Sequence, residues 1–123
     1  MSRRRVVVTG LGCISPVGNT VSDSWTNLLA GKSGIATVTA FDASALSCHF
    51  AGEVKGFDIT QYIPEKEASH MERFIHLGLA AAIDAVADSG LPVGDSLAEA
   101  PVSRIACTIR AGIGRLPRTD ETH

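Results

Sequence analysis

This 123-residue sequence has few aromatic residues, a net charge close to zero and no long apolar run. One Trp, one Tyr and four Phe stand against 12 Gly, which favours tight turns and close backbone packing over a large aromatic core. The formal net charge of −2 argues against charge-driven binding to nucleic acid or to an anionic membrane. No apolar run approaches the roughly 18 residues of a membrane span. Val6–Val8, behind the basic Arg3–Arg5, is too short for the apolar part of a secretory signal.

Cysteine is also scarce, and its spacing excludes two common uses. Cys13, Cys48 and Cys107 are odd in number, lie far apart and form no C-x-x-C pair, so neither a disulfide scaffold nor a zinc site is expected. We expect reduced thiols in or near the core of a cytoplasmic protein. Cys13 and Cys107 are predicted to be buried and inert, because neither stands at the start of a predicted helix, where a thiolate would be stabilised.

The histidines show no metal-ligand spacing. His70 and His76 are six residues apart, which places them on different faces of a helix. No Ser-His-Asp or Cys-His arrangement can be argued from proximity either, so neither a metal site nor a catalytic triad is expected. The histidines are interpreted as surface groups or hydrogen-bonded core groups: His49, His70, His76 and His123.

The order of β-rich and helical patterns predicts one α/β domain with a parallel core, and 45% apolar residues are enough for a sizeable core. Thr20 with Asp23 begins the first helix and Gly31 ends it, while Gly90 ends the second. Two kinds of segment are predicted, extended at residues 4–9, 35–38, 50–54 and 103–109, and helical at residues 21–30, 59–62 (a single turn) and 65–89.

The predicted sheet is short of partners. Residues 4–9 contain the run Val6–Val8, which suits a strand buried on both faces of a parallel sheet. The three strands at 4–9, 50–54 and 103–109 and the two helices at 21–30 and 65–89 cannot cover both faces of such a sheet, so we expect this chain to lack a partner for that run. The Ala-rich second half of the helix at 65–89 predicts that another segment approaches it closely, although alanine also simply favours helix.

Gly10-Leu11-Gly12-Cys13-Ile14-Ser15 follows the first strand and invites comparison with a dinucleotide-binding loop. That loop needs Gly or Ala where Ser15 stands and a helix opening there, whereas Pro16 follows. No acidic residue lies near Lys32, about where a ribose would be held. The glycines are therefore interpreted as a turn beside packed backbone, and no cofactor is expected.

The order of motifs resembles one family along essentially the whole chain. The matching stretches are Arg4-Arg5-Val6-Val7-Val8-Thr9-Gly10-Leu11-Gly12, Ile14-Ser15-Pro16-Val17-Gly18-Asn19, Leu28-Leu29-Ala30-Gly31-Lys32-Ser33-Gly34-Ile35, Phe50-Ala51-Gly52-Glu53-Val54-Lys55-Gly56-Phe57, and Gly112-Ile113-Gly114. They resemble the N-terminal portion of the β-ketoacyl-acyl carrier protein synthases, the type II condensing enzymes of fatty acid synthesis. Residues 1–123 are then the N-terminal part of a synthase domain, with no second domain.

The resemblance implies a thiolase-like α/β fold, of which this chain is an incomplete first half in the order strand-helix-strand-helix-strand. It also implies a decarboxylative Claisen condensation between acyl and malonyl thioesters, with acyl carrier protein as partner, no cofactor, and a homodimer or other self-association. The family's nucleophilic cysteine, at a helix N-terminus, and its two histidines fall beyond this sequence. We therefore expect no catalytic residue here and no condensing activity from the chain alone.

Two features can still carry family roles. Ile113, with Gly112 and Gly114, matches the loop that gates the acyl pocket, and the alternative is a turn with one core isoleucine. Lys66 matches one of the basic residues that meet the acidic carrier protein, and the alternative is a solvated helix face.

The glycine loop departs from the family pattern at Arg110 and Arg115, where the family has glycines. Burying an unpaired guanidinium would cost several kcal/mol, so these residues suggest a domain fragment or a truncated product that has drifted. The alternative function, from a different class, is a non-catalytic interaction fragment that self-associates or binds a full-length synthase.

Overall fold

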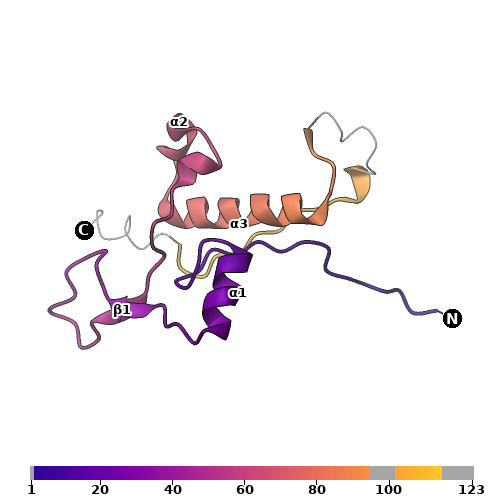
Figure 1. The fold of residues 1–123 in the computed structure, drawn as a ribbon. Helices are drawn as coiled ribbons and strands as arrows, with labels where there is room; N and C mark the ends of the chain where they lie inside the picture. Colours follow the sequence, from indigo (N-terminus) through magenta and orange to yellow (C-terminus); the bar gives the residue numbers. More distant parts are fainter. Residues whose placement is uncertain (1, 95–101, 115–123) are drawn as a thin grey trace.

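The computed structural model describes residues 2–94 and 102–114. Figure 1 shows one long helix, with the other elements arranged along it and toward one end. In chain order the elements are α1 (Val21–Leu29), β1 (Ile35–Thr37), β2 (Phe50–Gly52), the 3-10 turn η1 (Ile59–Gln61), α2 (Glu65–Ala68), α3 (Arg73–Ser89) and the 3-10 turn η3 (Val102–Arg104).

α1 forms where the capping residues predict it. Thr20 is extended, and its Oγ1 accepts a hydrogen bond from the backbone N–H of Asp23 at 3.0 Å, which satisfies one of the free donors of the first turn. At the other end, the N–H of Gly31 donates to the carbonyl of Leu28, and Gly31 takes a φ of +70° that favours glycine. Both predicted ends are confirmed.

The single helix predicted over residues 65–89 is wrong at its start, because the structure divides it into α2 and α3. The Ser69 hydroxyl donates to the carbonyl of Lys66 at 2.8 Å, which satisfies locally an oxygen that a continuing helix would use. Glu72 is extended, with φ −79° and ψ 159°, and α3 starts after it. The predicted stop is confirmed, since Gly90 ends α3 in the left-handed conformation.

The only sheet in the described residues is antiparallel, which corrects the predicted parallel core. β1 pairs with β2 in the register Ile35 with Gly52, Ala36 with Ala51 and Thr37 with Phe50. The Val38 N–H donates to the His49 carbonyl at 2.9 Å and extends the pairing by one bond. The edge strand predicted at 50–54 is thus present, although its partner is the neighbouring segment of a hairpin.

The strands predicted at 4–9 and 103–109 are not formed among the described residues. The second segment runs along α3, whereas the first extends away past the C-terminal end of that helix (Figure 1). Val6, Val7 and Val8 are 93%, 70% and 78% exposed, whereas the sequence predicts burial on both faces. A strand exists only when its backbone groups pair with a neighbour. Apolar, β-branched sequence therefore does not by itself produce a strand here.

Two glycines that follow the first of these segments touch the backbone of α3. A Cβ on Gly10 would collide with the carbonyl oxygen of Ala85, and one on Gly12 with that of Ala81. Between them, the N–H of Leu11 donates to Oδ2 of Asp88 at 2.9 Å. This contact confirms both the close approach predicted for the Ala-rich half of the helix and the structural interpretation of the glycines.

Very little of the described part of the chain is buried, contrary to the expected sizeable core. The buried apolar residues of the described part are Ala43, Ala68 and Ala80, and no large side chain there is fully buried. The accessible surface is 10275 Å², whereas a compact protein of 12.9 kDa exposes about 6,300 Å². About 4,000 Å² is therefore exposed in excess of a self-contained domain of this mass.

The contact between Gly12 and α3 can be tested by a substitution that adds only a methyl group. Gly12→Ala places its Cβ against the Ala81 carbonyl, so we expect the contact to weaken by about 1–3 kcal/mol. Hydrogen exchange of the Leu11 amide should accelerate at least fivefold. Gly112→Ala is the control, because a Cβ there meets nothing within 4 Å. Equal exchange rates in the two variants would contradict this packing.

Candidate functional site

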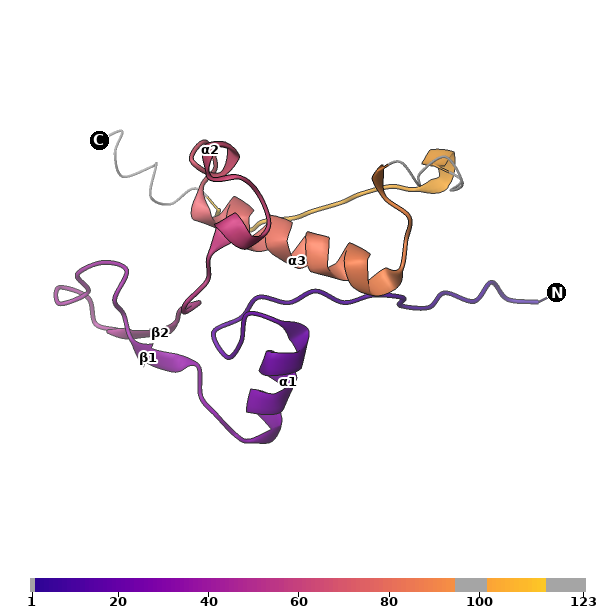
Figure 2. The same cartoon turned by 45° about the horizontal axis from the view of Figure 1, so that its top comes forward.

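The two predicted site features lie at the same end of the molecule, beside the start of α3. Gly114 packs on Phe74, and a Cβ on Gly114 would come within 2.6 Å of the aromatic ring. α2, which carries Lys66, is joined to the same end of α3 by a bond of 2.9 Å between His76 Nε2 and the carbonyl oxygen of Ala68. Figure 2 shows α2 next to the first turns of α3.

The Gly112–Gly114 loop presents its isoleucine to solvent. Ile113 is 80% exposed, and Gly112 is exposed as well. The two open cavities beside α1 are not lined by this loop. The role of Ile113 as a pocket gate therefore stays a prediction. Arg110 is exposed, so its guanidinium carries no burial cost, while Arg115 lies outside the described residues.

Lys66 is an exposed residue of α2 with acidic neighbours on both sides. Glu65 and Glu67 flank it in the sequence, and all three are exposed. Arg73, at the start of α3, has its guanidinium 6.0 Å from the centroid of the Phe57 ring and donates to the carbonyl of Val54 at 3.3 Å. The structure thus places two cationic side chains near this end of α3, and docking through Lys66 stays a prediction.

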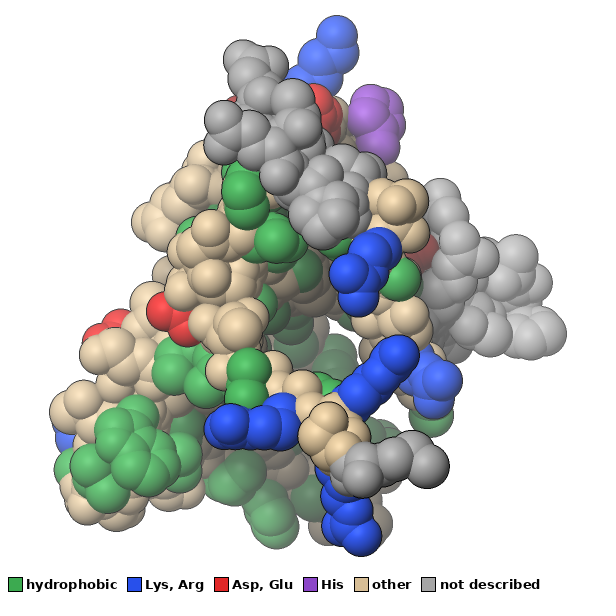
Figure 3. All heavy atoms as spheres, turned by 90° about the vertical axis from the view of Figure 1, so that its right-hand side faces the viewer, with side chains coloured by type: hydrophobic (Ala, Val, Ile, Leu, Met, Phe, Trp, Pro, Cys, Tyr) green, Lys and Arg blue, Asp and Glu red, His purple; other side chains and the backbone are tan. Residues whose placement is uncertain are grey.

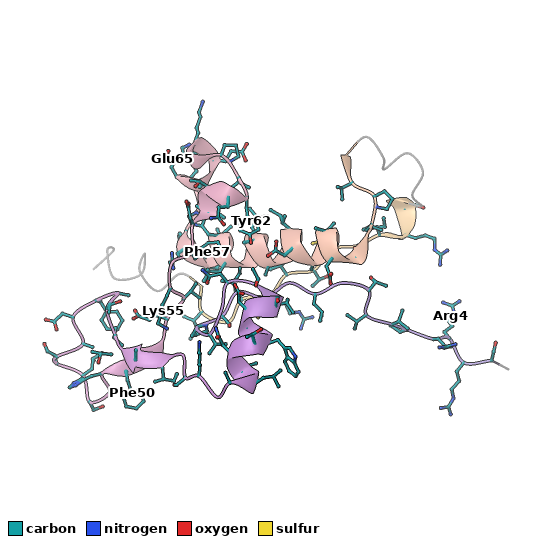
Figure 4. All side chains as sticks on the ribbon, viewed as in Figure 1. Arg4, Phe50, Lys55, Phe57, Tyr62 and Glu65 are labelled. Carbon is teal, nitrogen blue, oxygen red and sulfur yellow. The ribbon has the colours of Figure 1, made fainter. Side chains whose placement is uncertain are left out.

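The most densely bonded polar feature is the Lys55 clamp, which we define as the Lys55 ammonium and the three carbonyls it reaches. Its Nζ donates to the carbonyls of Pro16 and Gly34, both at 3.2 Å, and to that of Glu53 at 3.1 Å. In addition, the carbonyl of Lys55 accepts a hydrogen bond of 2.8 Å from Asn19 Nδ2. Figure 4 shows Lys55 between the hairpin and the turn that precedes α1. The clamp therefore joins three segments that are distant in sequence.

The turn that the clamp holds is itself ordered by hydroxyl and amide groups. Ser15 and Gly18 exchange backbone hydrogen bonds at 2.9 and 3.2 Å. The hydroxyl of Ser15 lies 3.0 Å from that of Ser24, which is buried and also donates to the carbonyl of Gly18. Asn27 donates its amide to the carbonyl of Val17. These side chains all make hydrogen bonds that order the turn, so their arrangement supports a scaffold role rather than catalysis.

Two open cavities flank α1. One, of about 460 Å³, is polar and adjoins the Lys55 clamp, Asn19 and Asn27. The other, of about 600 Å³, lies between α1 and α3 and is lined by Leu11, Thr20, Val21, Ser22, Trp25, Tyr62, Asp84 and Asp88. Neither cavity contains the nucleophile, base and orienting group that covalent catalysis requires.

A tyrosine–carboxylate bond joins η1 to α3 at the second cavity. Tyr62 donates its hydroxyl proton to Oδ2 of Asp84 at 2.9 Å. Partial burial raises the pKa of Tyr62, and the hydrogen bond to the Asp84 carboxylate and its charge raise that pKa further. The phenol therefore stays protonated near neutral pH and acts as a donor that fixes η1 on α3.

The thiols are more exposed than predicted. Cys48 and Cys107 are exposed and Cys13 is half-buried, so the prediction of a buried Cys107 is wrong because its segment pairs with no strand in the described part. No cysteine stands at the start of a described helix. Within the residues the structure describes, no three His, Cys, Asp or Glu side chains gather as metal ligands, and no helix is both long and apolar enough to cross a membrane.

Sequence reasoning misses the Lys55 clamp and the contact of Phe74 with Gly114. In the sequence, Lys55 is only one residue of a stretch that matches the family. Nothing in the local pattern indicates that its ammonium reaches the carbonyl of Pro16, 39 residues away. Phe74 is visible only as part of the apolar repeat of a helix. Such contacts depend on tertiary placement, which neither spacing nor periodicity encodes.

Comparison with known proteins identifies what this arrangement resembles. The chain matches the family described as "Beta-ketoacyl synthase, N-terminal domain" over residues 3–121. It is 51% identical over 123 residues to 3-oxoacyl-[acyl-carrier-protein] synthase 2 of Vibrio cholerae, with all of this chain and 29% of that protein covered. The synthase 2 of Synechocystis is 45% identical over 116 residues, which cover 94% of this chain and 27% of that protein.

A solved structure agrees with the sequence relatives. The ishigamide ketosynthase/chain length factor superimposes with a TM-score of 0.64 and 37% sequence identity, over 74% of this chain and 23% of that one. The likeness supports the predicted thiolase-like α/β fold, of which this chain is a part. The chain spans less than a third of the length of these two synthases.

Removing the ammonium of the Lys55 clamp should loosen the turn before α1. Lys55→Met keeps the aliphatic stem and deletes three hydrogen bonds, and we expect a loss of about 1–2 kcal/mol. Exchange of the Ser15 and Gly18 amides should accelerate about 5- to 30-fold. Lys32→Met, in the same cavity but outside the clamp, serves as the control. A variant that exchanges as slowly as the parent would exclude the clamp.

The loop of the hairpin should open in acid. The backbone N–H of Thr39 lowers the pKa of Glu53, assisted by the N–H of Ala40, the Thr39 hydroxyl and the charge of Lys55. Because the folded-state pKa is depressed, this stabilisation is present above the unfolded pKa of about 4.3 and is lost as the pH falls through the folded value.

NMR exchange of the Thr39 and Ala40 amides between pH 6 and pH 3 measures this effect. Their protection should fall with acid in the parent and be weak at every pH in Glu53→Gln, which carries no titrating charge. Protection that is independent of pH in the parent would contradict the assignment.

Proposed function

Because this chain belongs to the beta-ketoacyl synthase N-terminal domain family, we propose that it forms the N-terminal portion of a 3-oxoacyl-acyl carrier protein synthase. That enzyme joins an acyl thioester to a malonyl thioester, with loss of carbon dioxide, in fatty acid biosynthesis. The observation that carries the proposal is the similarity of the whole chain to 3-oxoacyl-acyl carrier protein synthases at 40–51% identity. The match begins near the first residue and keeps the order of motifs throughout.

In this proposal the chain contributes scaffold rather than reacting groups. A condensing enzyme needs a thiolate nucleophile, which is favoured at a helix N-terminus beside positive charge. Thr20, Pro64 and Glu72 precede the described helices, and no thiol stands there. What the chain does supply is α3 with two extended segments against it. The nucleophile and the histidines then come from ketosynthase sequence that this chain does not span.

The Gly112–Gly114 loop is proposed to border the acyl chain. Gly114 is held on Phe74, and the absence of a Cβ is what permits that approach. Ile113 projects from this fixed point as an exposed apolar side chain. An isoleucine in that position is suited to contact the apolar tail of an acyl substrate once the remaining walls of a pocket are present.

Carrier-protein docking is proposed at the α2 end of the molecule. Acyl carrier protein is the acidic partner expected from the resemblance, and Lys66 is an exposed cation on α2. Glu65 and Glu67 reduce the local positive charge, so Lys66 would act as one contact of a larger basic surface. A cytoplasmic location and self-association through the completed fold are part of the same proposal.

A chimeric enzyme tests the proposal directly. The matched 29% of the Vibrio cholerae synthase is replaced by residues 1–123, and carbon dioxide release from malonyl carrier protein is measured. We expect turnover within about tenfold of the parent synthase. The isolated chain should show none, since it lacks the nucleophile.

Two results would contradict this proposal. A chimera that is soluble and folded like the parent but inactive would show that this chain cannot serve as the N-terminal portion. Robust turnover by the isolated chain would show that the reacting groups lie within it.

Lys66→Glu in the active chimera is expected to raise KM for the carrier protein at least twofold with kcat unchanged, and an unchanged KM would remove Lys66 from the docking surface.

A further inference from the structure

We propose that Phe74 is a positioning residue: its ring sets how far the Ile113 side chain reaches, and thereby which lengths of acyl chain the enzyme accepts. The inference rests on the proposed function, in which Ile113 borders the acyl substrate, and it adds the residue that holds Ile113 in place. It is carried by the contact between the Phe74 ring and Gly114, and by how firmly each side of that contact is held.

Gly114 is the point at which the segment after η3 packs against α3. Residues 103–113 are exposed, whereas Gly114 is half-buried. A Cβ added to Gly114 would lie 2.6, 2.7 and 2.9 Å from three carbons of the Phe74 ring, which is closer than side-chain carbons pack. The backbone of Gly114 therefore lies directly against the ring, so the size and shape of residue 74 determine where that backbone can lie.

The other side of the loop has no comparable contact. A Cβ added to Gly112 would meet nothing within 4 Å, and Ile113 itself is 80% exposed. Neighbouring Cα atoms stand about 3.8 Å apart across a trans peptide bond, so a displacement of Gly114 on the ring moves Ile113 with it. The position of Ile113 thus depends on the single contact with Phe74.

The Phe74 ring is carried by a helix start that is itself held in place. Phe74 is the second residue of α3, and residues on both sides of it make tertiary contacts. The Arg73 guanidinium lies 6.0 Å from the centroid of the Phe57 ring. His76 Nε2 lies 2.9 Å from the carbonyl oxygen of Ala68. Figure 4 shows Phe57 beside the first turn of α3. The ring therefore supports Gly114 from a fixed position.

Exposure alone does not single out Ile113. Apolar side chains are exposed over much of the described chain, and Figure 3 shows several of them on the face where the chain begins. What distinguishes Ile113 is that the residue after it is held by a close contact. A wall of an acyl pocket needs such a defined position, because one methylene in an apolar pocket changes selection between substrates by about 10- to 200-fold.

Two substitutions should move the loop in opposite directions. Phe74→Leu removes the flat ring, so Gly114 settles toward α3, Ile113 withdraws and longer acyl chains gain room. Gly114→Ala adds a methyl group against the ring and pushes the loop away from α3, so Ile113 advances and longer chains lose room. Gly114 is not in the left-handed conformation, so this variant acts through its methyl group rather than through backbone strain.

The test uses the active chimera and two substrates, hexanoyl and hexadecanoyl carrier protein. The quantity measured is the ratio of kcat/KM for the long substrate to kcat/KM for the short one. We expect Phe74→Leu to raise this ratio about fivefold or more and Gly114→Ala to lower it by a similar factor. The double variant should return toward the parent ratio, because the smaller leucine leaves space for the added methyl group.

Two further variants separate positioning from general stability. Phe74→Tyr keeps the ring and should keep the ratio within about twofold of the parent. Ile75→Ala removes an exposed apolar side chain from the next position, about 100° around the helix, and should also leave the ratio unchanged. A loss of stability lowers kcat/KM for both substrates alike, so it does not change their ratio.

NMR on the isolated chain tests the contact without any substrate. Nuclear Overhauser signals should join the Phe74 ring protons to the α-protons of Gly114, and Phe74→Tyr should retain them. A folded α3 without these signals would overturn the inference, whatever the activity of the chimera.

The remaining outcomes separate this inference from the proposed function. An active chimera whose ratio does not change in Phe74→Leu and Gly114→Ala, or changes in the same direction in both, overturns the inference and leaves the proposed function standing. An inactive parent chimera counts against the proposed function, and the inference falls with it. If Phe74→Leu alone fails to fold, Gly114→Ala decides: a lowered ratio supports the inference and an unchanged one overturns it.

Discussion

The structure depends on one unmet requirement, which is that β-branched apolar segments need hydrogen-bonded neighbours to become strands. Val6–Val8 and the segment at 103–109 have the composition of buried parallel strands; the second lies beside α3, and the first extends past the end of that helix (Figure 1). Within the described residues they have no ladder partner, so they stay exposed. The exposed thiol of Cys107 follows from this deficit, and the exposed side chains of the two segments contribute to the large accessible surface.

α3 is the element that most of the other described segments contact. Its second half presents small residues to Gly10 and Gly12, and Asp88 holds the intervening backbone. At the opposite end, Phe74 receives Gly114, and further side chains of α3 anchor α2 and η1. These contacts are mostly between backbone and single side chains. They set directions and close approaches but bury little apolar area, which is why a scaffold is recognisable without a filled core.

Local features were predictable from the sequence, and features that need a partner were not. Thr20, Gly31 and Gly90 marked helix ends because capping depends on a few adjacent residues. Three features were not predicted: the break at Ser69, the antiparallel hairpin and the exposure of Cys107. Each depends on which hydrogen-bonding groups lie nearby in the folded chain. The family came from the order of motifs along the whole chain, while the roles of Ile113 and Lys66 stay predictions that further sequence must complete.

Amide hydrogen exchange on the isolated chain tests the central claim most directly. Residues 6–8 and 105–109 should exchange within about tenfold of unstructured peptide rates, because their amides have no ladder partner. The amides in the middle of α3 should be protected in the same sample, which shows that the helix is present. Strong protection of residues 6–8 and 105–109 in the monomeric chain would mean that it completes its own sheet, and it would contradict the claim that these segments need a partner.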